Sequence, residues 1–196
     1  MKIGCLFGSF DPPHLGHVLL ARYVKEHCGL DQVWLVVTPQ NPFKQHRQLS
    51  PEKHRLAMTH LAVQGLEGIS ASGLELDLPQ PNYTVDTLAF MRERWPQHQF
   101  SLIIGSDNLA TLHQWKDASL MLEKTPVHVY PRPGLEEHLA QADLLYHPSV
   151  SVLPDAPQTP VSSTGIRVRL RSWKPVDGLL DPKVLAYIRQ NGLYAD

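Results

Sequence analysis

Two histidines, His14 and His17, are the residues whose spacing most clearly predicts chemistry. Residues three apart on a helix share one face, so both imidazoles would point at the same neighbour. They follow the segment Gly8-Ser9-Phe10-Asp11, whose small residues let a ligand reach backbone N–H groups, and a helix that starts at His14 adds its own N–H groups. The pattern predicts an anion site. A metal pair is a weaker alternative, because no Cys or carboxylate ligand set accompanies the imidazoles.

The elements that must position these histidines alternate between strands and helices. Residues 3–7 and 33–37 are apolar runs of strand length, and residues 14–27 repeat apolar side chains at helical spacing, which together form a βαβ unit. The alternation predicts a three-layer α/β, Rossmann-like fold with a mostly parallel sheet, in a single domain over residues 1–196. The further elements that we expect are extended segments at 69–78, 100–104, 127–130 and 149–153, and helices at 51–64, 83–94, 163–172 and 182–191.

Helix starts are predicted from capping residues. Ser50 is expected to be an N-cap, with Pro51 at the first helical position. Thr84 is expected to cap the helix at 83–94, and the pair Ser163-Thr164 to cap the helix at 163–172. N–H groups at the start of the helix near Thr84 would favour a carboxylate.

Ligands of open parallel sheets bind beyond the carboxyl ends of the strands. Gly8 follows the first predicted strand, and Gly105-Ser106-Asp107 follows the strand at 100–104. We therefore expect both segments at one crevice.

The composition narrows the class of protein. The formal net charge of −1 gives no general basic field for nucleic acid, and no stretch has the length of a signal peptide or a membrane span. Two scattered cysteines form no disulfide framework, so a cytoplasmic protein is expected, without nucleic-acid or membrane partners. Local positive charges are expected to be solvated by default, namely Arg47, Lys53, Arg55, Arg169 and Arg171.

Two motifs in the order and separation found here resemble those of a nucleotidyltransferase superfamily. GSFDPPHLGH at 8–17 resembles its (T/H)xGH motif, and SSTGIR at 162–167 resembles its SSTxIR segment. Within that superfamily the chain is similar to the bacterial nicotinate mononucleotide adenylyltransferases over nearly its whole length, apart from residues 135–160. The segments that carry this second likeness are PQNPFK at 39–44 (with Phe43 where His is usual), YTVDTL at 83–88, GSDNL at 105–109 with Trp115, RPG at 132–134, and the tail at 179–194.

The resemblance implies adenylyl transfer from ATP to nicotinate mononucleotide, with Mg²⁺ on the phosphates and no covalent intermediate. It implies that His14, His17, Arg167 and Lys44 act on the phosphates. It further implies that ATP meets Gly8, Ser9, Phe10, Gly105, Asp107, Ser163 and Thr164, and that the mononucleotide meets Lys44, Thr84, Trp115 and Arg132. From the residues alone, Trp115 fits a core position as well as a ring-stacking one.

Other functions stay open. An adenylyltransferase for nicotinamide mononucleotide or phosphopantetheine would use the same motifs, and so would a non-catalytic nucleotide-binding regulator. A dehydrogenase fits less well, because no GxGxxG opens the first helix. The sequence leaves open whether the chain forms a homo-oligomer. The central expectation is that His14, His17 and Arg167 converge on one polyphosphate.

Overall fold

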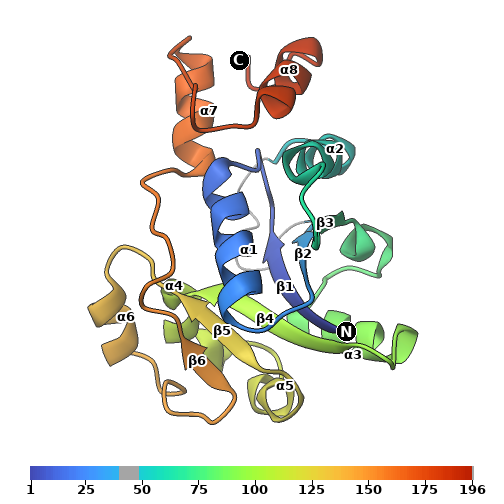
Figure 1. Cartoon of the computed structure of the whole chain (residues 1–196), viewed down its shortest axis with the longest axis vertical. Helices are drawn as coiled ribbons and strands as arrows, with labels where there is room; N and C mark the ends of the chain where they lie inside the picture. The colour runs from blue at the N-terminus through green and yellow to red at the C-terminus, as the bar shows by residue number, and fades with distance from the viewer. Residues whose placement is uncertain (40–48, 196) are drawn as a thin grey trace.

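A six-stranded parallel sheet forms the centre of the computed structural model, which describes residues 1–39 and 49–195 (Figure 1). The strand order is β3-β2-β1-β4-β5-β6, and every neighbouring pair is parallel. This confirms the predicted α/β class. The strands are β1 (Lys2–Gly8), β2 (Gln32–Val37), β3 (Ile69–Ser72), β4 (Gln99–Gly105), β5 (Val127–Tyr130) and β6 (Val150–Val152).

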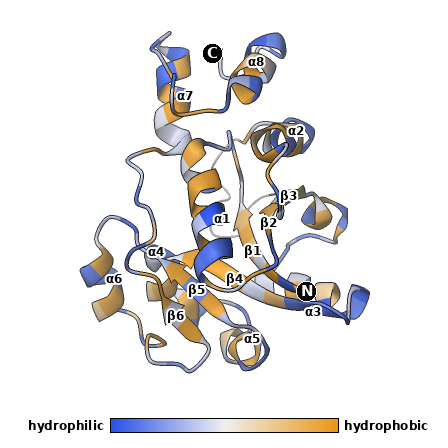
Figure 2. Ribbon diagram, viewed as in Figure 1, coloured by the Kyte–Doolittle hydropathy of each residue, from blue (hydrophilic) through white to orange (hydrophobic). Residues whose placement is uncertain are grey.

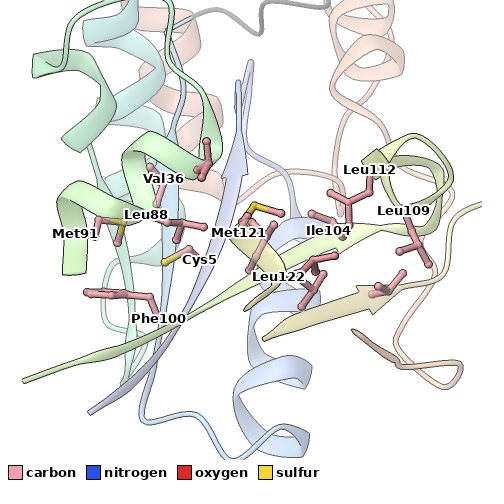
Figure 3. Close-up of a cluster of buried hydrophobic side chains, with 14 of the residues drawn as sticks. Cys5, Val36, Leu88, Met91, Phe100, Ile104, Leu109, Leu112, Met121 and Leu122 are labelled. Atoms are coloured by element: carbon pink, nitrogen blue, oxygen red, sulfur yellow. The ribbon is translucent and has the colours of Figure 1, made fainter. Parts of the chain in front are cut away.

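Helices cover both faces of the sheet. Successive strand residues point to opposite faces, so Cys5 and Leu6 belong to different clusters of buried side chains. Cys5 packs with α3 (Thr84–Arg94) and α5 (Ala118–Lys124), as Figure 3 shows for Leu88, Met121 and Leu122, whereas Leu6 packs with α1 (Leu15–His27). The helices are α1 (Leu15–His27), α2 (Glu52–Val63), α3 (Thr84–Arg94), α4 (Ser106–Ala110), α5 (Ala118–Lys124), α6 (Leu135–Ala140), α7 (Ser163–Arg171) and α8 (Pro182–Gln190), with 3₁₀ turns at Leu74–Asp77 and Leu112–Gln114.

Because helices cover both faces of the sheet, most strand side chains are buried and apolar. In Figure 2 the strands at the centre of the molecule are coloured mostly hydrophobic. A third cluster lies away from the sheet, where Met58 of α2 packs with Ile166 of α7 and Val184 of α8. This cluster fixes α7 and α8 beside α2 and α1, at the top of Figure 1.

The strand order reverses at β1. The chain builds outward from β1 through β2 to β3, and then returns to the other side of β1 with β4. Such a switch point leaves a crevice between the strand ends, where ligands of these folds bind. Gly8 and Gly105 end the two strands at this place, as the sequence predicts.

Several predicted boundaries are wrong. The segment 69–78 is not extended throughout, because β3 ends at Ser72 and a 3₁₀ turn follows Gly73. The short helices α4, α5 and α6 were not predicted, since segments of five to seven residues carry too little periodicity to be detected.

The predicted caps are each displaced by one residue. Pro51, not Ser50, is the N-cap of α2, and Tyr83, not Thr84, is the N-cap of α3. Ser162 caps α7, where its hydroxyl accepts a hydrogen bond from the N–H of Gly165 at 3.1 Å. Ser163 instead donates to another segment, described below.

Candidate active site

Two neighbouring cavities lie at the carboxyl end of the sheet, and Tyr130 at the end of β5 lines both. The first, which we call the Trp115 cavity, is bounded by Gly8 and Ser9 after β1, Gly105 after β4, Thr84 at the start of α3, and Trp115. The second, the histidine cavity, is bounded by His14, His17, Arg132 and the segment 157–161. The crevice predicted from the sequence therefore has two compartments.

Trp115 both lines a cavity and packs against the core. Its ring is partly buried beside the cluster that contains Leu109 and Leu112. The core and ring-stacking interpretations are thus compatible. Thr84 is the first residue of α3, so backbone N–H groups of the first turn lie at the edge of this cavity.

The two imidazoles lie against each other. Their ring centroids are 3.7 Å apart with 22° between the planes, and Phe10 meets His17 edge-on at 5.0 Å. The backbone N–H of His14 donates to Nδ1 of His17 at 3.1 Å. Because that nitrogen accepts, a neutral His17 carries its proton on Nε2 and can donate it to a ligand.

Both histidines are neutral at physiological pH. Burial is the larger cause and the nearby charge of Arg132 the smaller one, and together they lower the pKa of His14 from 6.5 to about 4. The pKa of His17 is also lowered well below its ordinary value, by burial, by His14 and by Arg132. The positive charge of this cavity therefore comes from Arg132.

The lowered pKa of His14 predicts how stability depends on pH. The unfolded chain binds a proton on His14 below pH 6.5, but the folded chain binds it only near pH 4. The contribution of His14 to the free energy of unfolding is therefore complete above pH 6.5 and is lost as the pH falls from 6.5 towards 4. We expect the free energy of unfolding to fall less steeply in His14→Gln than in the parent chain, as measured by urea unfolding at about pH 7, 6 and 5. Parallel curves would contradict a buried neutral His14.

Gly16 and Gly105 lack room for a side chain. A Cβ at Gly16 would collide with the Thr159 hydroxyl, so the segment 157–161 lies directly on the start of α1. A Cβ at Gly105 would collide with the carboxylate of Asp107 and would lie 2.8 Å from Cγ of Arg132. Each glycine thus allows a neighbouring segment to approach the crevice.

Arg132 lies in the histidine cavity and not among the residues that line the Trp115 cavity. Its backbone N–H donates to the Ser106 hydroxyl at 3.1 Å, and its side-chain Nε is 3.8 Å from Oδ1 of Asp107. The side chains of Arg132 and Asp107 are 45% and 46% exposed, so this ion pair is open to a ligand.

Arg167 binds the loop between β1 and α1. Its guanidinium donates to the carbonyl oxygen of Asp11 at 2.6 Å and to the Thr164 hydroxyl at 3.3 Å, and lies 3.9 Å from the Asp11 carboxylate. Ser163 donates to the carbonyl oxygen of Pro12 at 2.8 Å. The two sequence motifs therefore meet, although Arg167 does not line the histidine cavity itself.

One predicted residue, Lys44, lies outside the described residues, as do residues 40–43 of its segment and Arg47. Lys53, Arg169 and Arg171 are exposed as predicted.

Arg55 corrects the expectation of a solvated side chain, because it is 1% exposed. It donates to the carbonyl oxygens of Ser9 at 2.8 Å, Thr38 at 2.6 Å, Pro39 at 2.8 Å and Ser50 at 2.9 Å. It thereby joins the loop after β1 to both ends of the loop after β2. The sequence signal for this burial is helical spacing: Arg55 lies three and seven residues before the apolar Met58 and Ala62, which share the buried face of α2.

Among the described residues, no three His, Cys, Asp or Glu side chains are grouped so that they could hold a metal ion. In the same part of the chain, no helix has the length and apolar character that crossing a membrane requires.

Several known proteins are similar to this chain in sequence and fold. Residues 5–169 match the cytidylyltransferase-like family. The chain is 43% identical over 194 residues to the probable nicotinate-nucleotide adenylyltransferase of Flavobacterium johnsoniae, with 99% of each covered, and 35% identical over 193 residues to the nicotinate-nucleotide adenylyltransferase of Bacillus subtilis, with 98% of each covered.

The fold is similar to that of the Plasmodium falciparum nicotinic acid mononucleotide adenylyltransferase complexed with NaAD. The TM-score is 0.79 at 18% sequence identity, with 98% of this chain and 97% of that one covered. The chain therefore belongs to the cytidylyltransferase-like family, as one of its nicotinate-nucleotide adenylyltransferases.

Proposed function

We propose that this enzyme transfers the adenylyl group of ATP to nicotinate mononucleotide, giving nicotinate adenine dinucleotide and pyrophosphate. The observation that carries this proposal is the pair of adjoining cavities at the switch point of the sheet. One offers an aromatic face and a helix N-terminus to a pyridine ring with a carboxylate, and the other offers imidazoles and a guanidinium to phosphates.

The reaction needs no general base. A phosphate oxygen of the mononucleotide is already an anion, and it forms a bond to the α-phosphorus of ATP while the bond from that phosphorus to the bridging oxygen of pyrophosphate breaks. The protein then contributes mainly by aligning the two substrates and stabilising the developing charge.

The histidine cavity is the proposed triphosphate site. His17 would donate from Nε2, and the buried Nδ1 of His14, which has no partner within the described ranges, leaves a bonding position for a ligand or water. We assign Arg132 to the phosphates rather than to the mononucleotide, because its charge lies beside the histidines. Arg167 would act with Ser163 and Thr164 on the β- and γ-phosphates from the adjacent loop.

The remaining proposed contacts divide between the substrates. The backbone of Gly8, Ser9 and Phe10 would meet the nucleotide, and Gly105 and Asp107 would meet adenosine, with Asp107 on the ribose hydroxyls. The N–H groups near Thr84 would hold the nicotinate carboxylate, and Lys44 the mononucleotide phosphate.

Mg²⁺ would arrive as part of the ATP complex. The described residues offer no resident cluster of ligands, but Mg²⁺ keeps several waters and binds phosphate oxygens readily. We further propose that the enzyme acts as a single domain in the cytoplasm.

Replacing Trp115 with alanine should raise KM for the mononucleotide about tenfold with a smaller change in kcat, because the stacking surface is lost. Trp173→Ala is the matched control, since Trp173 is 90% exposed and lines neither cavity. Steady-state kinetics with ATP saturating would measure both. An unchanged KM in Trp115→Ala would leave Trp115 with its core role alone.

The proposed function is tested by pyrophosphate release from ATP with each acceptor. Nicotinate mononucleotide should give the highest kcat/KM, above nicotinamide mononucleotide and phosphopantetheine. Preference for either of those acceptors would change the assigned substrate. Binding of ATP without pyrophosphate release from any of the three would identify a regulator.

A further inference from the structure

Four side chains from distant parts of the chain hold residues 9–13, in the loop that connects β1 to α1. Arg55 of α2 binds the carbonyl oxygen of Ser9, while Arg167 and Ser163 of α7 bind the carbonyl oxygens of Asp11 and Pro12. The fourth is Tyr194, beyond α8, whose hydroxyl lies 2.5 Å from Oδ1 of Asp11 although the two residues are 183 positions apart. No function proposed above accounts for Tyr194.

The loop depends on such outside contacts. Phe10 has a φ of 46°, a left-handed conformation that is unfavourable for a residue other than glycine. The Asp11 side chain is 1% exposed, and a carboxylate so deeply buried must receive hydrogen bonds to remain stable. Besides Tyr194, only the more distant N–H of Ser50 at 3.3 Å donates to this carboxylate within the described ranges.

Tyr194 is suited to be a permanent donor. Burial and the neighbouring Asp11 raise the pKa of the Tyr194 hydroxyl, so it keeps its proton across the physiological range. A short hydrogen bond to a charged oxygen is among the stronger ones in proteins. Asp11 is only three residues before His14, so the bond fixes the loop at the point where α1 begins.

We propose that Tyr194 is a positioning residue for adenylyl transfer: through Asp11 it holds the loop that sets the place of His14 and His17. The inference rests on the proposed function, because the histidines matter only if phosphates bind beside them. It adds a residue from the C-terminal segment to a site otherwise built from the strand ends, the starts of α1 and α3, and α7.

The test is Tyr194→Phe, which removes one hydroxyl and keeps the ring. Tyr187→Phe is the matched control: its hydroxyl also joins the C-terminal segment to another element, bonding Nδ1 of His54 on α2 at 2.9 Å, away from the loop. Both variants should lower the unfolding midpoint by about 2–4 °C. Only Tyr194→Phe should lower kcat, on the order of tenfold, with KM for the mononucleotide within about twofold of the parent value.

A double variant shows whether Tyr194 acts through Asp11. If it does, adding Tyr194→Phe to Asp11→Ala, which removes the acceptor, should lower kcat by much less than tenfold, because the effects are coupled. If Tyr194→Phe is partly unfolded, kcat is measured per folded molecule in a stabilising osmolyte.

Two outcomes would overturn the inference. One is a kcat per folded molecule in Tyr194→Phe that equals that of Tyr187→Phe, and the other is additive effects in the double variant. A parent chain that releases no pyrophosphate would remove the proposed function first and this inference with it, so the two failures are distinguishable.

Discussion

Replacing His17 with alanine is expected to lower kcat on the order of 10²-fold or more while the fold persists. The Nδ1 atom of His17 accepts from the backbone of His14, so its proton lies on Nε2 and that atom is the donor available to a phosphate. Loss of a fixed donor to developing charge usually reduces the rate by that amount. The ring is half-buried at the start of α1, so most packing of the helix should survive.

His27→Ala is the control for this experiment, because His27 is exposed at the last turn of the same helix. Pyrophosphate release measures kcat, and circular dichroism with thermal unfolding reports the fold. Activity close to that of the parent chain in His17→Ala would refute the assignment of the histidine cavity to the triphosphate.

Replacing Arg55 with methionine should reduce the free energy of unfolding by roughly 3–5 kcal/mol. Methionine fills a similar space, but the carbonyl oxygens of Ser9, Thr38, Pro39 and Ser50 would each lose a charged donor. Buried acceptors without partners are costly, and the Asp11 carboxylate nearby would lose a compensating charge.

Arg22→Met provides the comparison, since Arg22 is exposed on α1 and its replacement should change stability by less than about 0.5 kcal/mol. Urea unfolding measures both variants. Equal stabilities would mean that the bonds of Arg55 are replaced by others in the variant.

The sequence predicts the sheet and the histidine pair because both depend on local patterns. Apolar runs identify β1, β2 and β4, and helical spacing places His14 and His17 on one face. The motifs at both ends of the chain predict that α7 approaches the loop between β1 and α1. The hydrogen bonds of Arg167 and Ser163 to that loop agree with this prediction.

The rest depends on contacts between distant residues. Nothing local in the sequence indicates that Arg132 lies with the histidines or that Tyr194 reaches Asp11. For Arg55, helical spacing places the residue on the buried face of α2, but charged side chains are usually solvated. The four carbonyl oxygens that accept from its guanidinium explain its burial, and they come from parts of the chain that the local pattern does not bring together.

The dependence of the first loop on α7 and Tyr194 has a consequence for biosynthesis. A ribosome makes the histidine segment within its first twenty or so residues, but the contacts that hold it come from residues 163–194. Nascent chains fold from the N-terminus as they emerge. We therefore expect the sheet to assemble during translation, whereas the loop between β1 and α1 gains these contacts only when the final helices have been made. A chain that ends before residue 163 should fold its sheet but leave this loop without the contacts that hold it.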